Sequence, residues 1–98
     1  MRRGGQAGVA WSDEGLKALS ARVVRAAPDF ATAQQMRANV LCGQCDAWEA
    51  VPRSAAELRE AATHYERAAA LNTAPAVKAD LAHAADLCRQ DAAVVVAM

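Results

Sequence analysis

Cys42 and Cys45 are the residues whose type and spacing best fit a chemical site. They belong to the segment Cys42-Gly43-Gln44-Cys45, which has the spacing of thiol–disulfide sites and of half a zinc site. Redox pairs of this kind lie at the N-terminus of a helix, where the helix dipole favours the thiolate. This pair follows a helical pattern and is expected at a helix C-terminus. A small thiol-redox or zinc-binding protein therefore stays an alternative, while small apolar cysteines in helix contacts are favoured.

Further zinc ligands are difficult to assemble from this sequence. A zinc site needs four ligands, and the other candidates are His64, His83 and Cys88. His83 and Cys88 are about 140° apart around a helix of 3.6 residues per turn, so they face nearly opposite sides. Both histidines stand near acidic residues and are expected to be solvated and charge-balanced. No metal or other cofactor is predicted.

Catalysis is not expected either. The hydroxyl residues Ser12, Thr32, Ser54 and Thr73 stand near expected helix starts, where they are explained as caps or first-turn residues. The carboxylates are spread over exposed faces, and no Gly-rich phosphate loop follows a strand. These observations predict a protein that is not an enzyme.

The composition predicts a small helical protein with a thin core. Of its 98 residues 54% are apolar and only 4% are aromatic, and about half of the apolar ones are Ala, which favours helices over strands. Eleven basic and eleven acidic residues give no net charge, so nucleic acid and anionic membranes are not expected partners. No apolar run is long enough for a membrane span or a signal peptide. Three cysteines, an odd number, favour a reducing compartment, so the cytoplasm is the default localisation.

The order of elements follows from stop and start signals. A Gly-rich, disordered leader is expected at residues 1–11, followed by a single helical domain at 12–98. Ser12, Asp29, the capping box Ser54-Ala55-Ala56-Glu57, and Thr73 with Pro75 are the start signals. Pro28 and Gly43 are stop signals. The expected helices are 13–27, 30–43, 55–71 and 75–90, and the tail after Gln90 either continues the last helix or frays.

Apolar spacing assigns a buried face to each of these helices. In the second helix the polar residues Gln34, Gln35, Arg37 and Asn39 lie mostly off the stripe formed by Phe30, Ala33, Met36, Val40 and Leu41. Gln35, Arg37 and Asn39 are therefore candidate partner-binding residues that would bond to a peptide backbone, although a solvated face explains them equally well. Trp48 in the 45–53 connection is a second candidate, as an aromatic anchor, although packing of this connection against the chain's own helices explains it at least as well. Val77, Leu81, Ala84 and Cys88 are expected on the buried face of the last helix.

The chain contains a degenerate internal repeat. Arg25-Ala26-Ala27 recurs 42 residues later as Arg67-Ala68-Ala69, and Leu41-Cys42-Gly43-Gln44 recurs 46 residues later as Leu87-Cys88-Arg89-Gln90. A period in the forties predicts a repeated helix-turn-helix unit. Chance similarity between Ala-rich helices is the competing explanation.

Two segments resemble the second-helix endings of tetratricopeptide (TPR) repeats: Val24-Arg25-Ala26-Ala27-Pro28-Asp29-Phe30-Ala31 and His64-Tyr65-Glu66-Arg67-Ala68-Ala69-Ala70-Leu71-Asn72. The segment 77–82 is similar to the first helix of a following repeat, and the likeness covers about residues 14–90. The sequence departs from the family pattern at Thr73, where Pro is usual, at Arg37, near a usually apolar position, and in the long 45–53 connection. The chain is also similar to short Ala-rich proteins of GC-rich protists that have no assigned function.

The resemblance implies a right-handed, TPR-like array of two antiparallel helix pairs. It also implies a non-catalytic interaction module that binds a protein or peptide partner. Helical repeats normally need three or more units for stability, and at most two and a half are present here. Self-association, or origin as a fragment of a longer array, is therefore expected to accompany this fold.

Overall fold

The structure is a computed structural model that describes residues 12–43 and 52–97. These residues form four α-helices and no strand, which confirms the expected all-α class. The helices are α2 (Asp13–Ala26), α3 (Ala31–Cys42), α4 (Ala55–Leu71) and α5 (Pro75–Ala97). The leader expected at residues 1–11 lies outside the described residues.

The helix starts follow local hydrogen bonding. Ser12 Oγ accepts a hydrogen bond of 2.9 Å from the Gly15 N–H at the start of α2. At the start of α4, Ser54 and Glu57 form both bonds of a capping box, at 3.1 and 3.0 Å. Pro75 is the first residue of α5, as the sequence predicts.

The expected cap of α3 at Asp29 is wrong. The helix begins at Ala31, so Phe30 occupies the N-cap position, and its apolar side chain accepts no hydrogen bond. Asp29 belongs instead to the turn after Pro28. That turn is held by Gln34, whose Nε2 donates to the Pro28 carbonyl over 2.8 Å.

The C-terminal ends of α3 and α5 are determined in different ways. Gly43 ends α3 in the left-handed region, with φ 71° and ψ 22°, and its N–H donates to the Val40 carbonyl over 3.2 Å. α5 does not stop at Gln90 but continues to Ala97. Residues 91–97 contain no Gly or Pro that would break a helix, and Ala92 is buried.

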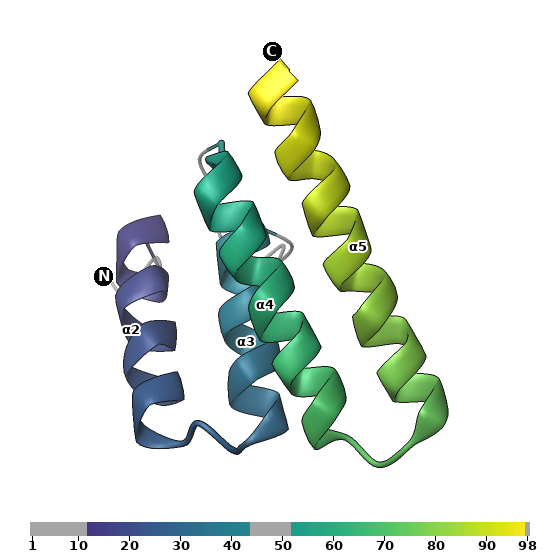
Figure 1. Cartoon of the computed structure of the whole chain (residues 1–98). Helices are drawn as coiled ribbons and strands as arrows, with labels where there is room; N and C mark the ends of the chain where they lie inside the picture. The colour runs from purple at the N-terminus through teal and green to yellow at the C-terminus, as the bar shows by residue number, and fades with distance from the viewer. Residues whose placement is uncertain (1–11, 44–51, 98) are drawn as a thin grey trace, which may run out of the picture.

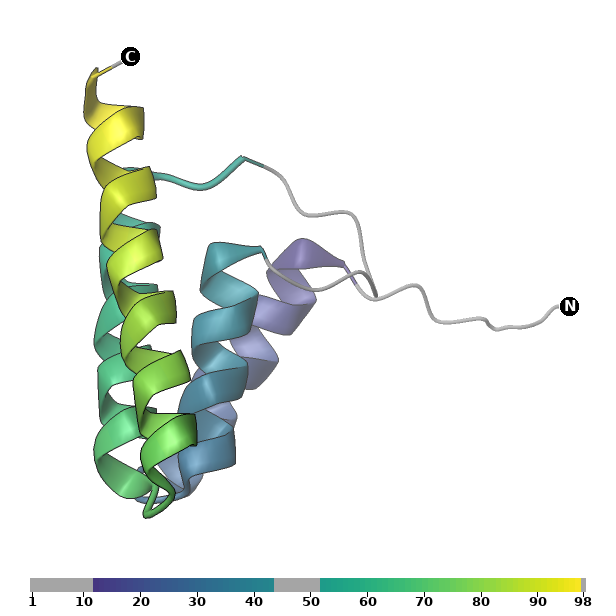
Figure 2. The same ribbon diagram turned by 90° about the vertical axis from the view of Figure 1, so that its right-hand side faces the viewer.

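The four helices form an open array in which each helix runs antiparallel to the one before it (Figure 1). α2 packs on α3, α3 on α4, and α4 on α5. α4 and α5 lie in one layer, with α3 and then α2 behind them (Figure 2). The C-terminal turns of α5 extend past the neighbouring end of α4 (Figures 1 and 2).

The core lies between α3, α4 and α5. It is built mostly from Ala with a few larger side chains. Its residues are Ala38, Leu41, Ala61, Ala62, Tyr65, Ala68, Leu81, Ala85 and Cys88. Two residues expected in the apolar stripes are exposed rather than buried, Phe30 to 58% and Val77 to 40%. Small side chains let the helices approach closely, and this makes the core thin.

A buried ion pair ties the starts of α2 and α4 together. The guanidinium of Arg53, just before α4, donates to both carboxylate oxygens of Asp13 over 2.6 Å each. Arg53 Nη2 also donates to the Val40 carbonyl over 2.8 Å. This bidentate geometry fixes three helices relative to one another.

Candidate functional site

Arg37 and Asn39, expected to bind a partner, lie half-buried in contacts with the chain's own helices. The Arg37 guanidinium donates to the Lys17 carbonyl at 2.8 Å, to Ser20 Oγ at 3.0 Å and to Glu60 Oε2 at 3.3 Å. It thus joins α2, α3 and α4. Gln35 is exposed on α3, and Trp48 lies outside the described residues.

His64 is buried rather than solvated, which corrects the expectation for this residue. Its side chain is 6% exposed, and Gln34 on α3 is 2% exposed. His64 Nδ1 and Gln34 Oε1 are 2.6 Å apart. Because Gln34 Nε2 already donates to Pro28, its Oε1 is the acceptor, and His64 Nδ1 therefore carries the proton.

The second ring nitrogen of His64 faces Glu60 Oε2 at 3.4 Å. Burial lowers the pKa of His64, the Glu60 carboxylate opposes this shift, and Arg67 and Arg37 reinforce it. The imidazole is therefore favoured in its neutral form. The arrangement of this network fits a structural link between α3 and α4.

Cys42, Tyr65 and Cys88 form a cluster at one edge of the core. Tyr65 Oη donates to Asn39 Oδ1 over 2.5 Å and lies 3.4 Å from Cys42 Sγ. Burial raises the pKa of Cys88 to about 12, and the neighbouring Cys42 thiol adds to the shift. Burial likewise raises the pKa of Tyr65. The Cys88 thiol and the Tyr65 phenol are kept neutral, as in a packed core.

The segment Cys42 to Cys45 is only partly described. Cys42 is the last residue of α3, the C-terminal position that the sequence predicts, and Cys45 lies outside the described residues. His83 is exposed and Cys88 is buried on α5, as their spacing predicts. Within 12–43 and 52–97 no three His, Cys, Asp or Glu side chains are placed to hold a metal ion.

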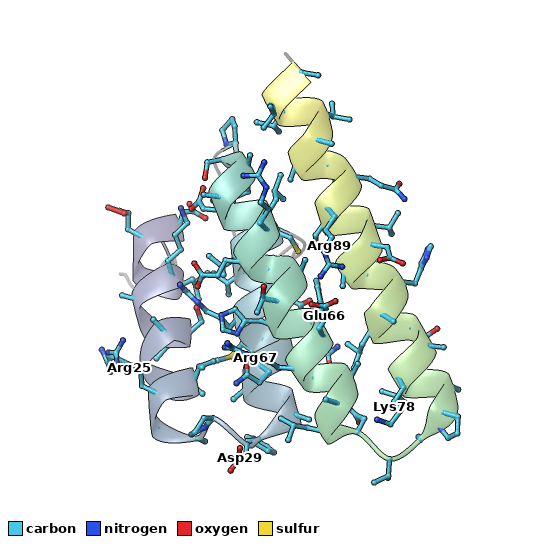
Figure 3. All side chains as sticks on the ribbon, in the orientation of Figure 1. Arg25, Asp29, Glu66, Arg67, Lys78 and Arg89 are labelled. Atoms are coloured by element: carbon cyan, nitrogen blue, oxygen red, sulfur yellow. The ribbon has the colours of Figure 1, made fainter. Side chains whose placement is uncertain are left out.

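A shallow hollow of about 330 Å³ lies beside the turn between α2 and α3. It is open to solvent and is lined by Pro28, Asp29, Gln34, Arg67, Ala70 and Leu71. Asp29 and Arg67 lie at its rim, both labelled in Figure 3. It offers one charge of each sign and no enclosed surface, so it does not define a ligand class.

One flank of α5 is left uncovered. We define the α5 flank as Val77, Asp80, Ala84, Leu87, Asp91 and Val94, which are spaced three or four residues apart and so lie along one side of the helix. Ala84 is half-buried and packs against the core, and the other five residues are exposed. Val77, Leu87 and Val94 are large apolar side chains that are 40%, 41% and 58% exposed. Val95, also exposed, lies at its edge.

Sequence reasoning missed this flank because it assigned a single apolar stripe to the helix. The buried face of α5 consists of Leu81, Ala85, Cys88 and Ala92. The larger apolar residues beside it, Val77, Leu87 and Val94, form a second stripe that is 40% to 58% exposed. The signal was present in the sequence as two overlapping apolar periodicities.

No described helix has both the length and the apolar character required to cross a bilayer. Comparison of the chain with protein-family models, with curated proteins and with solved structures finds no match.

Proposed function

We propose that the chain is a non-catalytic, TPR-like interaction module whose docking surface is the α5 flank. Its partner in this proposal is an amphipathic helix that carries basic side chains. The observation that carries the proposal is the row of exposed apolar side chains at Val77, Leu87 and Val94. An exposed apolar stripe of this length marks an interaction surface more often than a solvated face.

The helix class of the partner follows from the shape of the surface. α5 has 23 residues and extends beyond α4, so it offers a long, narrow stripe that matches a second helix packed ridge into groove. The charge of the partner follows from Asp80 and Asp91, because the flank contains two acidic residues and no basic one. Opposite charges beside an apolar contact set partner choice and orientation.

The consecutive antiparallel helices and the internal repeat also support the proposal. In helical-repeat proteins each helix face that is left open at the end of an array is a surface for a further helix. Arg37 and Asn39 of α3 form hydrogen bonds within the chain, and of the three polar α3 residues expected to bind a partner only Gln35 is exposed. The α5 flank is therefore the better candidate surface.

Two synthetic helical peptides with one apolar stripe test the proposal, one with Arg and one with Glu beside the stripe. Fluorescence anisotropy with the full chain should show binding of the Arg peptide and at least about tenfold weaker binding of the Glu peptide, a difference of about 1.4 kcal/mol. Val94→Glu should weaken binding of the Arg peptide.

Val96→Glu is the matched control. Val96 is 65% exposed and stands two residues from Val94 on the same helix. The two side chains point about 160° apart around the helix axis. Equal effects of the two substitutions, or equal binding of the two peptides, would contradict the proposed surface.

A further inference from the structure

We infer that the helix on the α5 flank is α2 of a second copy of this chain, so that copies associate head to tail. The inference rests on the proposed function, because it uses the same flank and names its partner. It is carried by the uncovered side of α2, by the internal repeat and by the charges at the two ends of the array.

The uncovered side of α2 has a covered counterpart in α4. On α4, positions 61, 64, 65 and 68 are all buried. His64 and Tyr65 of this set bond to Gln34 and Asn39 of α3. This is the side on which α4 receives the helix that precedes it.

The 42-residue spacing of the repeat identifies the positions of α2 that are equivalent to this side of α4. The corresponding residues are Leu19, Arg22, Val23 and Ala26, which we define as the α2 flank. Leu19 and Val23 are half-buried, and Arg22 and Ala26 are exposed. α2 thus presents apolar residues at positions that α4 buries against a preceding helix, and α2 is the first described helix.

Continuation of the array supplies that missing helix. Each helix is antiparallel to the next (Figure 1), so a preceding helix for α2 must run as α3 and α5 do. α5 is the last helix among the described residues, and none of the described helices follows it to cover its flank. Placing α5 of one copy against α2 of the next repeats the packing of α3 on α4.

Charge selects α2 as the partner of α5. The α5 flank has acidic residues at 80 and 91 and no basic residue, so pairing α5 with α5 brings only negative charges together. The α2 flank has Arg22 and no acidic residue. In the internal repeat, Asp80 of α5 is equivalent to Gln34 of α3, at a spacing of 46 residues. Arg22 of α2 is equivalent to His64 of α4, at a spacing of 42 residues. The His64–Gln34 contact within one copy therefore has an Arg22–Asp80 ion pair as its counterpart between copies.

Such a contact joins two different surfaces of the same protein. A heterologous interface of this kind extends into a chain of copies, or into a ring where the rotation closes. The association state should therefore rise with protein concentration and fall with added salt, because the ion pair is near the surface.

Sedimentation velocity of the full chain tests the inference. The wild-type protein should associate, and Arg22→Glu and Asp80→Arg should each remain monomeric, because each places like charges at the interface. An equal mixture of the two variants should associate again. In that mixture, Arg22 of the Asp80→Arg variant can pair with Asp80 of the Arg22→Glu variant. At the other interface, the Glu introduced at position 22 can pair with the Arg introduced at position 80.

Arg59→Glu is the control. It reverses the same charge as Arg22→Glu, but Arg59 is exposed on α4, which belongs to neither flank, so this variant should associate like the wild type. Circular dichroism should show the same helix content for all variants, because the substituted side chains are exposed.

Three results would overturn the inference. A wild-type chain that stays monomeric while it binds the Arg peptide excludes self-association but leaves the proposed function intact. Association that Arg22→Glu does not reduce places the contact elsewhere, as in an α5–α5 pair. Failure of the mixed variants to associate excludes the pairing of Arg22 with Asp80. Loss of peptide binding, with wild-type association unchanged, contradicts the proposed function instead.

Discussion

At the scale of single residues, His64 links helix packing to pH. Burial lowers its pKa below the usual 6.5, so the unfolded chain takes up this proton at a higher pH than the folded chain. The stabilisation is complete above about pH 7 and is lost as the pH falls through the pKa of the folded state. We expect the free energy of unfolding to decrease as the pH falls below about 6.5, the usual pKa of histidine.

Urea unfolding of His64→Gln and His83→Gln checks the assignment. His64→Gln removes the titrating group, so its free energy of unfolding should depend less on pH across this range. His83 is exposed on α5, and His83→Gln should behave as the wild type does. The same pH dependence in both variants would assign it to groups other than His64.

At the scale of helices, Gly43 limits the length of α3. Its backbone lies in the left-handed region, where a Cβ costs about 1 kcal/mol. Gly43→Ala should lower the free energy of unfolding by about 1 kcal/mol, and Gly43→Asn by less, since Asn tolerates this conformation better. Chemical denaturation measures both values. A Gly43→Ala variant as stable as the wild type would mean that α3 lengthens without cost.

The helices could be predicted from local signals, because their starts and stops depend on nearby residues. Ser54 and Glu57 bond to each other's backbone, Pro28 follows α2, and Gly43 ends α3. The end of α5 could not be predicted in this way, since no breaker follows Gln90. Its length depends on intrinsic helix propensity and on the burial of Ala92.

The candidate site was less predictable, because burial depends on which helix covers which face. His64 shares a helix face with charged residues, yet α3 covers it and Gln34 supplies its partner. Arg37 and Asn39 are polar residues of the kind that binds a peptide backbone, but within the chain they already form hydrogen bonds with Ser20 and Tyr65. Leu87 belongs to a regular apolar stripe and is uncovered only because no described helix follows α5. Sequence periodicity shows where apolar side chains lie, and topology decides which of them meet a partner.

At the scale of the whole molecule, stability is distributed unevenly along the array. The principal extents are 45 × 36 × 22 Å, and 22 Å is about two helix diameters, so no helix is surrounded on all sides. α4 lies between α3 and α5 and buries six residues, whereas α2 lies at one end and buries only Ser20. α2 is held chiefly by polar contacts, including the ion pair of Asp13 with Arg53.

This uneven burial predicts how amide hydrogens exchange with solvent. Opening α2 exposes little apolar surface, so at low protein concentration its amides should exchange at least about tenfold faster than those of α4, equivalent to about 1.4 kcal/mol. If α2 of one copy packs on α5 of the next, exchange at residues 19–26 should slow as the concentration rises, while exchange in α4 should not change. Arg22→Glu should abolish this slowing without altering the low-concentration rates. Protection of α2 equal to that of α4 in dilute solution would mean that polar contacts alone hold the first helix as firmly as the apolar core holds α4.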